Sequence, residues 1–499
     1  MPSSNPAARH RLTGPAIGAW LATAVGTLLR PRDDVLVVAI GAAAAVLALR
    51  RSPIVAGCAV GAVLGAAVAG WHVWGLHRGP VAALAAHRAE VDVIGRLVRD
   101  PVTTTTDSGG SLTLVDLTVI SVLRDGWRPT HAPVLVLSYG TGWAGLLPGQ
   151  RVEITGRLAP PRRGDDVAAV LDARAPPYAM GRPPWWQRAA GRVRGGLRDA
   201  AGSLPPDERG LLPGLVDGDV AAEPPPLTAD MRLTGLTHLQ AVSGENVSVV
   251  LGVVLALARS LGMRRRGRVV LSALALLAFV VLARPSPSVL RAAVMGGVSL
   301  LGLAAGRRIG AVPAIGFAVI VLVLTNPFLG RSVGFVLSVC ATSAIVLVAP
   351  RWTDRLATSM PRPLATAIAV PAAAQLACTP VLVLVFGQLT PYAVLANLLA
   401  APAVVPATVI GVCCAGAAML WHPGAVSLAW VAAGPTWVIA QVAHLLAALP
   451  GAGLRAPTGP LALCAYAAIA AGLICRRAIA QPPATSRAHN DRGRGDTSR

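Results

Sequence analysis

Residues 269–306 read VVLSALALLAFVVLARPSPSVLRAAVMGGVSLLGLAAG, which is two apolar runs separated by a short polar break. Each run approaches the length of about 20 residues that a helix needs to cross the hydrocarbon core of a membrane. The pattern continues over the second half of the chain. Of the 499 residues 54% are hydrophobic and only 13% are charged, against about 25% charged residues in soluble domains. These features predict a polytopic α-helical membrane protein and exclude an ordinary soluble enzyme.

Working outward from this stretch, we expect about 12 membrane segments. The expected segments are 15–29, 35–49, 53–74, 247–262, 269–283, 288–306, 311–325, 332–349, 364–386, 392–420, 425–449 and 459–475. Several are short for a span, and others contain internal proline at Pro371, Pro380, Pro402, Pro406 and Pro435. Some of these segments are therefore expected to be broken or re-entrant.

Arginine placement predicts the orientation, because short loops rich in Arg stay on the cytoplasmic side. The loops at 263–268, 307–308 and 351–362 are Arg-rich and are expected inside, together with both termini. Residues 81–235 and the later loops that hold one Arg each are then expected outside. The protein is expected in the plasma (inner) membrane with many passes.

The character of the sequence changes between residues 81 and 178, where β-branched residues alternate with polar ones. Runs at 91–98, 112–123, 133–139, 151–158 and 167–171 are separated by turn residues. Five strands in a short region predict a small extracytoplasmic all-β domain with an OB-like barrel. The expected division is N-terminal helices 1–75, β domain 76–180, amphipathic helix and linker 181–235, transmembrane channel domain 236–476 and disordered cytoplasmic tail 477–499.

Two features of the first half allow more than one interpretation. Residues 185–204 alternate as an amphipathic helix with Trp186 and several Arg, which suits a helix on a membrane surface or a packing helix on the soluble domain. Gly57, Gly61 and Gly65 form a stripe that could let two helices approach closely. In a chain with 52 Gly, chance explains the stripe equally well.

The charges of the second half are almost all positive. Between residues 236 and 475 there are two acidic residues, Glu245 and Asp354, and 14 Arg. Arg291 lies inside an expected span, where a charge is costly and normally faces a cavity or a partner. The alternative is an Arg that extends its head group to the membrane surface from a helix end.

Several reaction classes find no support in the residues. All the basic charge is Arg, so the Lys that a P-loop places on phosphates is missing. Neither the seven Cys nor the nine His show the spacing of a metal site. We therefore expect no enzyme activity, no metal and no cofactor.

A polar, glycine-bearing stretch precedes the first span of the second half. It reads LTGLTHLQAVSGENVS over residues 233–248. Flexibility at Gly235 and Gly244 would allow a broken helix whose N–H groups face a phosphate. His238 and Ser243 are five positions apart and give no support for a Ser–His nucleophile pair.

These segments resemble the ComEC-type DNA-internalisation channels of natural competence. The family's motifs are matched in order by GLVDGD at 214–219, HLQAVSG at 238–244, SVLRAAVM at 288–295, GFVLS at 334–338 and NLLAAP at 397–402. The N-terminal spans and external OB-like domain also match the family plan. Two departures stand out: Glu245 follows the Ser-Gly pair, and the H-x-H-x-D-H metal box of the family's nuclease-like domain is absent from this sequence.

The resemblance implies a membrane channel that passes single-stranded DNA inward during natural transformation. Candidates for the DNA path are His238, Ser243, Gly244, Asn246, Arg284, Arg291 and Asn397, and candidates for external DNA contact are Trp127, Tyr139 and Trp143. Implied partners are single-stranded DNA, membrane lipid, a DNA-receptor protein, a separate nuclease, a cytoplasmic motor or single-strand-binding proteins, and a second copy in a homo-oligomer. The alternatives are a transporter of another anion, such as a lipid-linked or phosphorylated solute, and a structural membrane scaffold.

Overall fold

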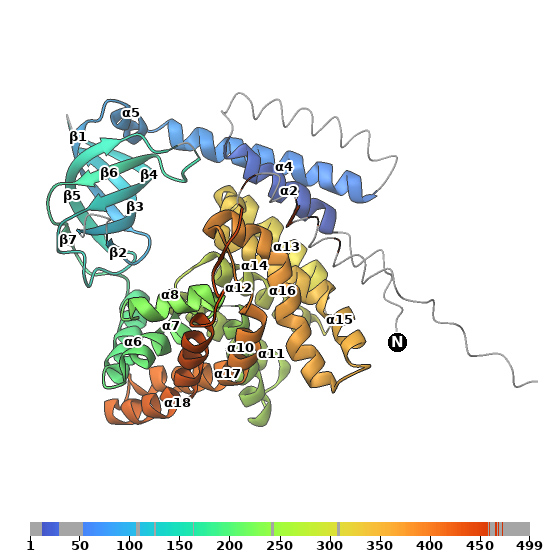
Figure 1. Cartoon of the computed structure of the whole chain (residues 1–499). Helices are drawn as coiled ribbons and strands as arrows, with labels where there is room; N and C mark the ends of the chain where they lie inside the picture. The colour runs from blue at the N-terminus through green and yellow to red at the C-terminus, as the bar shows by residue number, and fades with distance from the viewer. Residues whose placement is uncertain are drawn as a thin grey trace, which may run out of the picture.

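The structure is a computed structural model in which an N-terminal β domain is joined to a helical bundle (Figure 1). It describes residues 12–28, 53–105, 110–123, 126–162, 164–240, 244–306 and 310–457, with a few isolated positions beyond them up to residue 472. The expected segments 35–49 and 459–475, Ser243 and the C-terminal tail lie wholly or largely outside these residues. Every structural statement below refers to the described part.

The first two described helices, α2 (Thr13–Gly26) and α4 (Pro53–His77), pack side by side along their small residues. A Cβ added to Gly18 would lie 1.8 Å from the carbonyl oxygen of Cys58, and one added to Gly61 would lie 2.1 Å from that of Pro15. Only a residue without a side chain fits at these points. The glycine stripe of α4 is therefore a helix-packing surface rather than a chance feature.

A seven-stranded mixed sheet follows the short helix α5 (Pro80–Ala86). Its strands are β1 (Glu90–Leu97), β2 (Val102–Thr105), β3 (Ser111–Leu123), β4 (Trp127–Ser138), β5 (Arg151–Ala159), β6 (Ala169–Ala173) and β7 (Tyr178–Met180). Five of them close a ring in the order β1-β3-β4-β6-β5-β1, in which only β4 and β6 run parallel. The five expected strands all overlap these five, while the short β2 and β7 were not expected.

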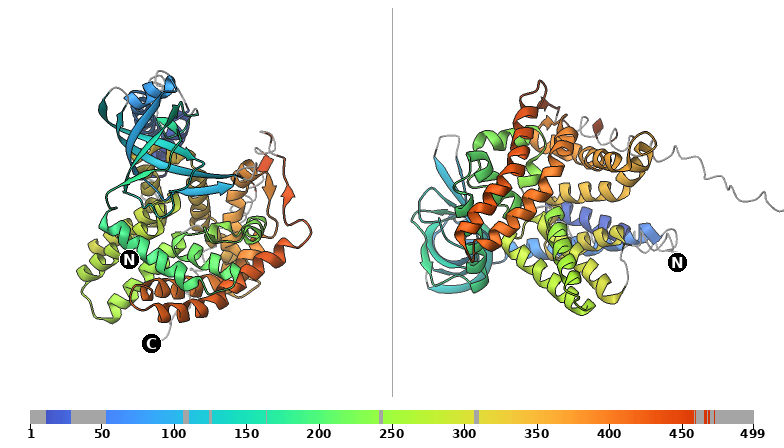
Figure 2. Two further views of the ribbon diagram at one scale, coloured as in Figure 1. Left: turned by 90° about the vertical axis from the view of Figure 1, so that its left-hand side faces the viewer. Right: turned by 90° about the horizontal axis from the view of Figure 1, so that it is seen from below.

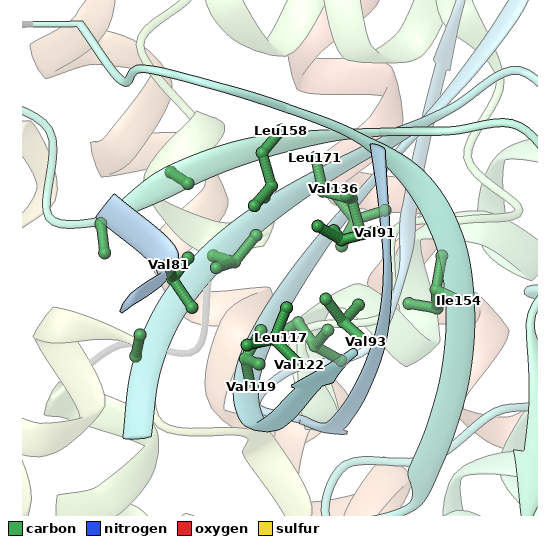
Figure 3. Close-up of a cluster of buried hydrophobic side chains, with 14 of the residues drawn as sticks. Val81, Val91, Val93, Leu117, Val119, Val122, Val136, Ile154, Leu158 and Leu171 are labelled. Carbon is green, nitrogen blue, oxygen red and sulfur yellow. The ribbon is translucent and has the colours of Figure 1, made fainter. Parts of the chain in front are cut away.

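Alternation of side chains builds the core of the ring. Val91, Val93 and Leu97 of β1 face inward, and their neighbours in sequence point outward. Val136, Ile154 and Leu171 come from other strands to the same cluster, which Figure 3 shows in close-up. The period of two in the sequence therefore decided which face is buried.

Four helices connect the β domain to the bundle. They are α6 (Trp185–Ala201), α7 (Pro206–Asp217), α8 (Pro225–Leu233) and α9 (Thr237–Gln240). The apolar face of α6, with Leu197, Ala200 and Ala201, packs against α17 (Ala393–Ala417) and α18 (His422–Ala447). The sequence allowed this helix either to lie on a membrane surface or to pack on the soluble domain. Its apolar face packs, but on the helical bundle.

The bundle itself is built from long apolar helices. Its other elements are α10 (Gly244–Ser260), α11 (Arg265–Ala283), α12 (Pro287–Ala305), α13 (Ala311–Thr325), the 3-10 turn η1 (Pro327–Arg331), α14 (Val333–Leu347), α15 (Ala349–Leu356), α16 (Arg362–Phe386), β8 (Gln388–Leu389) and β9 (Leu454–Arg455). Six described helices are long and apolar enough to cross a membrane: α4, α11, α12, α16, α17 and α18. The bent pair α14 and α15, at 43°, adds a seventh if it is one span.

Ten of the twelve expected segments coincide with described helices, and four of these, α2, α10, α13 and α14, are short. The expected breaks at proline are not seen, because α16, α17 and α18 continue through their internal prolines. Two of these prolines, Pro380 and Pro435, have a threonine neighbour whose hydroxyl donates within the same helix. Thr379 donates to the carbonyl of Gln375 at 2.7 Å, and Thr436 to that of Ala432 at 2.9 Å. The bend lies between α14 and α15 instead.

The β domain contacts the bundle at loops that were expected on its own side. Arg331 donates to the carbonyl of Gly164 at 2.8 Å. Arg284 binds both carboxylate oxygens of Asp100 at 2.7 and 2.8 Å. These contacts agree with the side expected for both Arg loops.

One contact disagrees with the expected alternation. The turn between α17 and α18 was expected on the side opposite the β domain. Gly196 of α6 packs against it, and a Cβ added there would lie 3.0 Å from the Cβ of Ala418. Because α6 belongs to the segment expected outside, the expected sides of α6 and of this turn do not fit together.

Candidate nucleic-acid path

Arg291 is a buried cation among the described residues of the bundle. It lies in the first turns of α12, which begins at Pro287 behind a Ser286 cap that accepts from the Val289 N–H at 3.4 Å. Its side chain points into the protein, and the residue is only 5% exposed. Burial of this degree excludes an Arg that extends to the membrane surface, so the inward-facing interpretation holds.

Three motif segments meet at the Arg291 guanidinium. Nε donates to the Ser338 hydroxyl of α14 at 2.9 Å, and Nη1 lies 3.3 Å from the Met295 sulfur one turn along α12. A Cβ added to Gly244 would lie 3.6 Å from Nη2. The segments HLQAVSG, SVLRAAVM and GFVLS, distant in sequence, therefore converge on one cation.

The surroundings of Arg291 favour an anion. Gly244 is the first residue of α10, and a helix N-terminus carries partial positive charge and unpaired N–H groups. A guanidinium beside it adds a full positive charge. The two described polar partners of Arg291, Ser338 and Met295, are both neutral. Such a place is suited to a phosphate. The side chain of Glu245 lies outside the described part.

Asn246 is buried and has a structural contact. Its Nδ2 donates to the carbonyl of Leu215 at 2.7 Å. This bond ties the first turn of α10 to the last turn of α7, so Asn246 fixes where the helix N-terminus lies. Asn246 is two residues after Gly244, which lies next to the Arg291 guanidinium.

The other path candidates lie apart from this centre. His238 is exposed, with Nδ1 3.1 Å from the Gly235 carbonyl. Asn397 donates to the carbonyl of Ala393 in its own helix at 2.7 Å. Arg284 is paired with Asp100 and also contacts Gln187, so its charge is neutralised in a joint between domains. We assign Arg284 to the joint rather than to the path.

The external aromatic candidates divide into two kinds. Trp127 and Tyr139 are 46% and 65% exposed and are available for stacking. Trp143 is 3% exposed and belongs to the core of the β domain. The expectation for Trp143 is therefore corrected: its ring packs on buried aliphatic side chains and cannot reach a nucleic acid. Tyr178, at 69%, is as open as Tyr139.

An ionic network that sequence reasoning missed anchors α6. Arg194 donates to the carbonyl of Asp217 at 2.7 Å and to that of Leu282 at 3.1 Å, and its Nη1 is 3.6 Å from the Asp217 carboxylate. Arg198 binds Asp219 through Nε at 3.1 Å and through Nη2. The two carboxylates belong to the GLVDGD motif, and Gly218 between them has φ +78°, which glycine adopts freely.

The pKa values of the two carboxyl groups in this network are shifted in opposite directions. Burial raises the pKa of Asp217 to about 6, and the Arg194 charge only partly offsets this effect. Burial also acts on Asp219, but the hydrogen bond from Arg198 and the charge of Arg194 outweigh it and hold the pKa of Asp219 below its usual value. The Oδ2 of Asp217 has no hydrogen-bond partner among the described residues.

A second polar cluster, at the other end of α7, was also not anticipated. His444 lies between Asp230, 2.6 Å from Nδ1, and Asp207, 3.0 Å from Nε2. It links α7, α8 and α18. Across the described ranges, no group of three or more His, Cys, Asp or Glu side chains could hold a metal ion.

Comparison with known proteins gives one curated relative and no matching solved structure. The relative is ComE operon protein 3 of Bacillus subtilis (strain 168), with 33% identity over 214 residues. The match spans 42% of this chain and 27% of the relative, so the chain covers only a part of that protein's length. The family described as Competence protein matches residues 215–479, which include Arg291, Ser338 and Gly244. Because this match covers more than half of the chain, the chain belongs to the competence protein family.

Proposed function

We propose that this protein passes single-stranded DNA through the plasma membrane during natural transformation. The single observation that carries the proposal is the convergence of three family segments on the buried Arg291 beside the N-terminus of α10. Passing phosphates would be attracted to this point in turn. Because the attraction is to the backbone, DNA of any sequence would be accepted.

The charge balance of the bundle supports a polyanion as the cargo. The 14 Arg between residues 236 and 475 face only two acidic residues. One of these, Asp354, is paired with Arg362 at 3.0 Å on the surface. A path of this kind repels cations and leaves few carboxylates to oppose a phosphate chain.

The β domain would act as the external receiving surface. Trp127, Tyr139 and Tyr178 are exposed on a small barrel, and base stacking on such aromatic rings tolerates any sequence. The proposed orientation places this domain outside and both termini in the cytoplasm. A DNA receptor, a separate nuclease and a cytoplasmic motor or single-strand-binding protein are the proposed partners.

Charge reversal at Arg291 tests the path. A phosphate about 4 Å from the guanidinium gains roughly 4 kcal/mol at an effective dielectric near 20. Arg291→Glu would turn this attraction into a barrier and is expected to lower DNA entry by about a thousandfold. Arg291→Gln should be milder, since it removes attraction without adding repulsion. The measurement is entry of labelled linear DNA per inserted protein molecule.

Arg455→Glu provides the matched control, because it makes the same charge change at an exposed position in β9. It should leave entry within about twofold of wild type, as expected for surface charges screened by salt. Wild-type entry per molecule in Arg291→Glu would show that Arg291 does not line the path. Loss of transport of a phosphorylated solute, with DNA entry unchanged, would favour the alternative of a small-anion transporter.

A further inference from the structure

Helices α17 and α18 are long and apolar enough to cross a membrane, but both ends of the hairpin that they form contact elements on the side of the β domain. A hairpin of two spans has its turn on one face of the membrane and its two free ends on the other. The position of the turn relative to the free ends therefore distinguishes a crossing hairpin from one that stays on a single side.

The free ends of this hairpin are on the side of the β domain. Helix α14 begins two residues after Arg331, which binds the β domain at Gly164. The Sγ of Cys378, late in α16, is 3.5 Å from the carbonyl of Leu337, early in α14. The end of α16 is thus on the β-domain side. The strand β8, which leads from α16 to α17, pairs there with β9, which follows α18.

The turn of the hairpin is on the same side. It packs through Ala418 against Gly196 of α6. Two residues earlier in α6, Arg194 donates to the carbonyl of Leu282 at the end of α11, next to Arg284 and its β-domain partner Asp100. Both ends of α17 and α18 are therefore connected to elements of the β-domain side.

A layer of charged helices runs along the hairpin between these two ends. Near the turn, a Cβ on Gly411 of α17 would lie 2.4 Å from a Val216 methyl group of α7. At the free end, His444 is held by Asp207 and Asp230 of α7 and α8. If the hairpin crossed the membrane, these carboxylates and their helices would have to cross with it, which is costly. Figure 2 shows α18 lengthwise in its left-hand view, whereas α4 runs across the view of Figure 1.

The aromatic residues of α18 suit the membrane surface rather than its centre. Trp430 and Trp437 are each 53% exposed. They lie within about 7 Å of the midpoint of α18 along its axis, at 1.5 Å per residue. In a spanning helix they would sit in the hydrocarbon centre, whereas Trp prefers the headgroup level.

The region around the turn adds an apolar edge with basic neighbours. Leu420 is 92% and Trp421 is 67% exposed at the turn, and Trp185 of α6 is 69% exposed. The Arg side chains at 182, 188 and 192 beside Trp185 are also exposed. Exposed Trp and Leu flanked by Arg fit a surface of anionic phospholipid.

We infer that α17, α18 and α6 together form a monotopic element that lies in the anionic phospholipid surface on the β-domain side, and that α17 and α18 do not cross the membrane. If α17 and α18 do not cross, the chain makes two fewer membrane crossings, so the expected side of every other segment is unchanged. This placement is independent of DNA transport, and it would hold if the protein carried another anion.

Single cysteines test the placement in a chain whose seven native Cys are replaced. Thr141→Cys in the β domain and Ser359→Cys in the turn before α16, both exposed, mark the two sides. Leu420→Cys at the turn is the probe. It should react with an impermeant thiol reagent in intact cells, as Thr141→Cys does. Reaction of Leu420→Cys only after permeabilisation, as for Ser359→Cys, overturns the inference.

An introduced charge gives an independent readout. A Cβ on Gly434 has no atom within 4 Å, so Gly434→Arg meets no steric obstacle. Leu274→Arg is its matched control, because Leu274 is 58% exposed at the midpoint of the apolar helix α11. Leu274→Arg should reduce the amount of inserted protein by roughly tenfold or more. Gly434→Arg should leave it within about twofold of wild type, and an equal loss in the two variants would contradict the inference.

Discussion

Asp217 is the residue whose environment differs most from what its neighbours in sequence indicate. It lies in a polar linker, where a charged side chain is normally solvated, yet it is 1% exposed. Its ion-pair partner, Arg194, belongs to another helix, so the local sequence does not predict this ion pair. Arg291 could be found from sequence because a lone Arg in an apolar run is unusual. Trp143 could not be separated from Trp127, because burial of one ring depends on how the strands close.

Protonation of Asp217 should make stability depend on pH. Its pKa is raised to about 6 in the folded protein, from about 3.9 in an unfolded chain. The folded state therefore binds the proton more tightly, and its stability falls as pH rises between about 4 and 6. The loss is roughly 3 kcal/mol and remains above pH 6. Unfolding midpoints of wild type and Asp217→Asn, measured from pH 4 to 7.5, should differ in slope, whereas Asp199→Asn, exposed on α6, should follow wild type. Parallel curves for wild type and Asp217→Asn would contradict the assignment.

At the scale of elements, the periodicity of apolar residues predicted the long strands and the apolar helices, which depend on local sequence. The long strands follow from alternation, whereas β2 and β7 have only four and three residues and show too little pattern to be recognised. Hydropathy identified apolar helices by length and composition but carries no information about direction. The α17–α18 hairpin shows this limit, because its turn contacts α6 on the side of the β domain.

The packing of α2 on α4 predicts a position-specific effect along one helix. Gly61→Leu would place a Cβ 2.1 Å from the Pro15 carbonyl oxygen and force the helices apart. Overpacking of this kind costs about 1–3 kcal/mol. Gly75→Leu is the control on the same helix, since no atom lies within 4 Å of its added Cβ. The apparent melting temperature in detergent should fall only for Gly61→Leu, and equal melting temperatures for the two variants would show that the contact contributes nothing.

At the scale of the whole molecule, the β domain and the bundle are joined by few but well-formed polar contacts. Arg284 holds Asp100 with two hydrogen bonds and also contacts Gln187 of α6, so three parts of the chain meet at one side chain. The sequence identified Arg284 as a charge near the end of an expected span. It could not identify Asp100 as the partner, because the two residues are separated by 184 positions.

This joint should be measurable as a coupling between distant residues. Arg284 is 14% and Asp100 33% exposed at the side chain, and a bidentate pair shielded in this way is expected to couple by about 1–3 kcal/mol. Asp100→Arg alone should lower the unfolding midpoint and increase protease cleavage between the β domain and the bundle. Adding Arg284→Asp should restore part of both. The Asp354–Arg362 pair, 61% and 74% exposed, serves as the reference and should couple by less than about 1 kcal/mol. If the two double-mutant cycles give equal coupling, the Arg284 joint is an ordinary surface pair and the β domain is held by its other contacts.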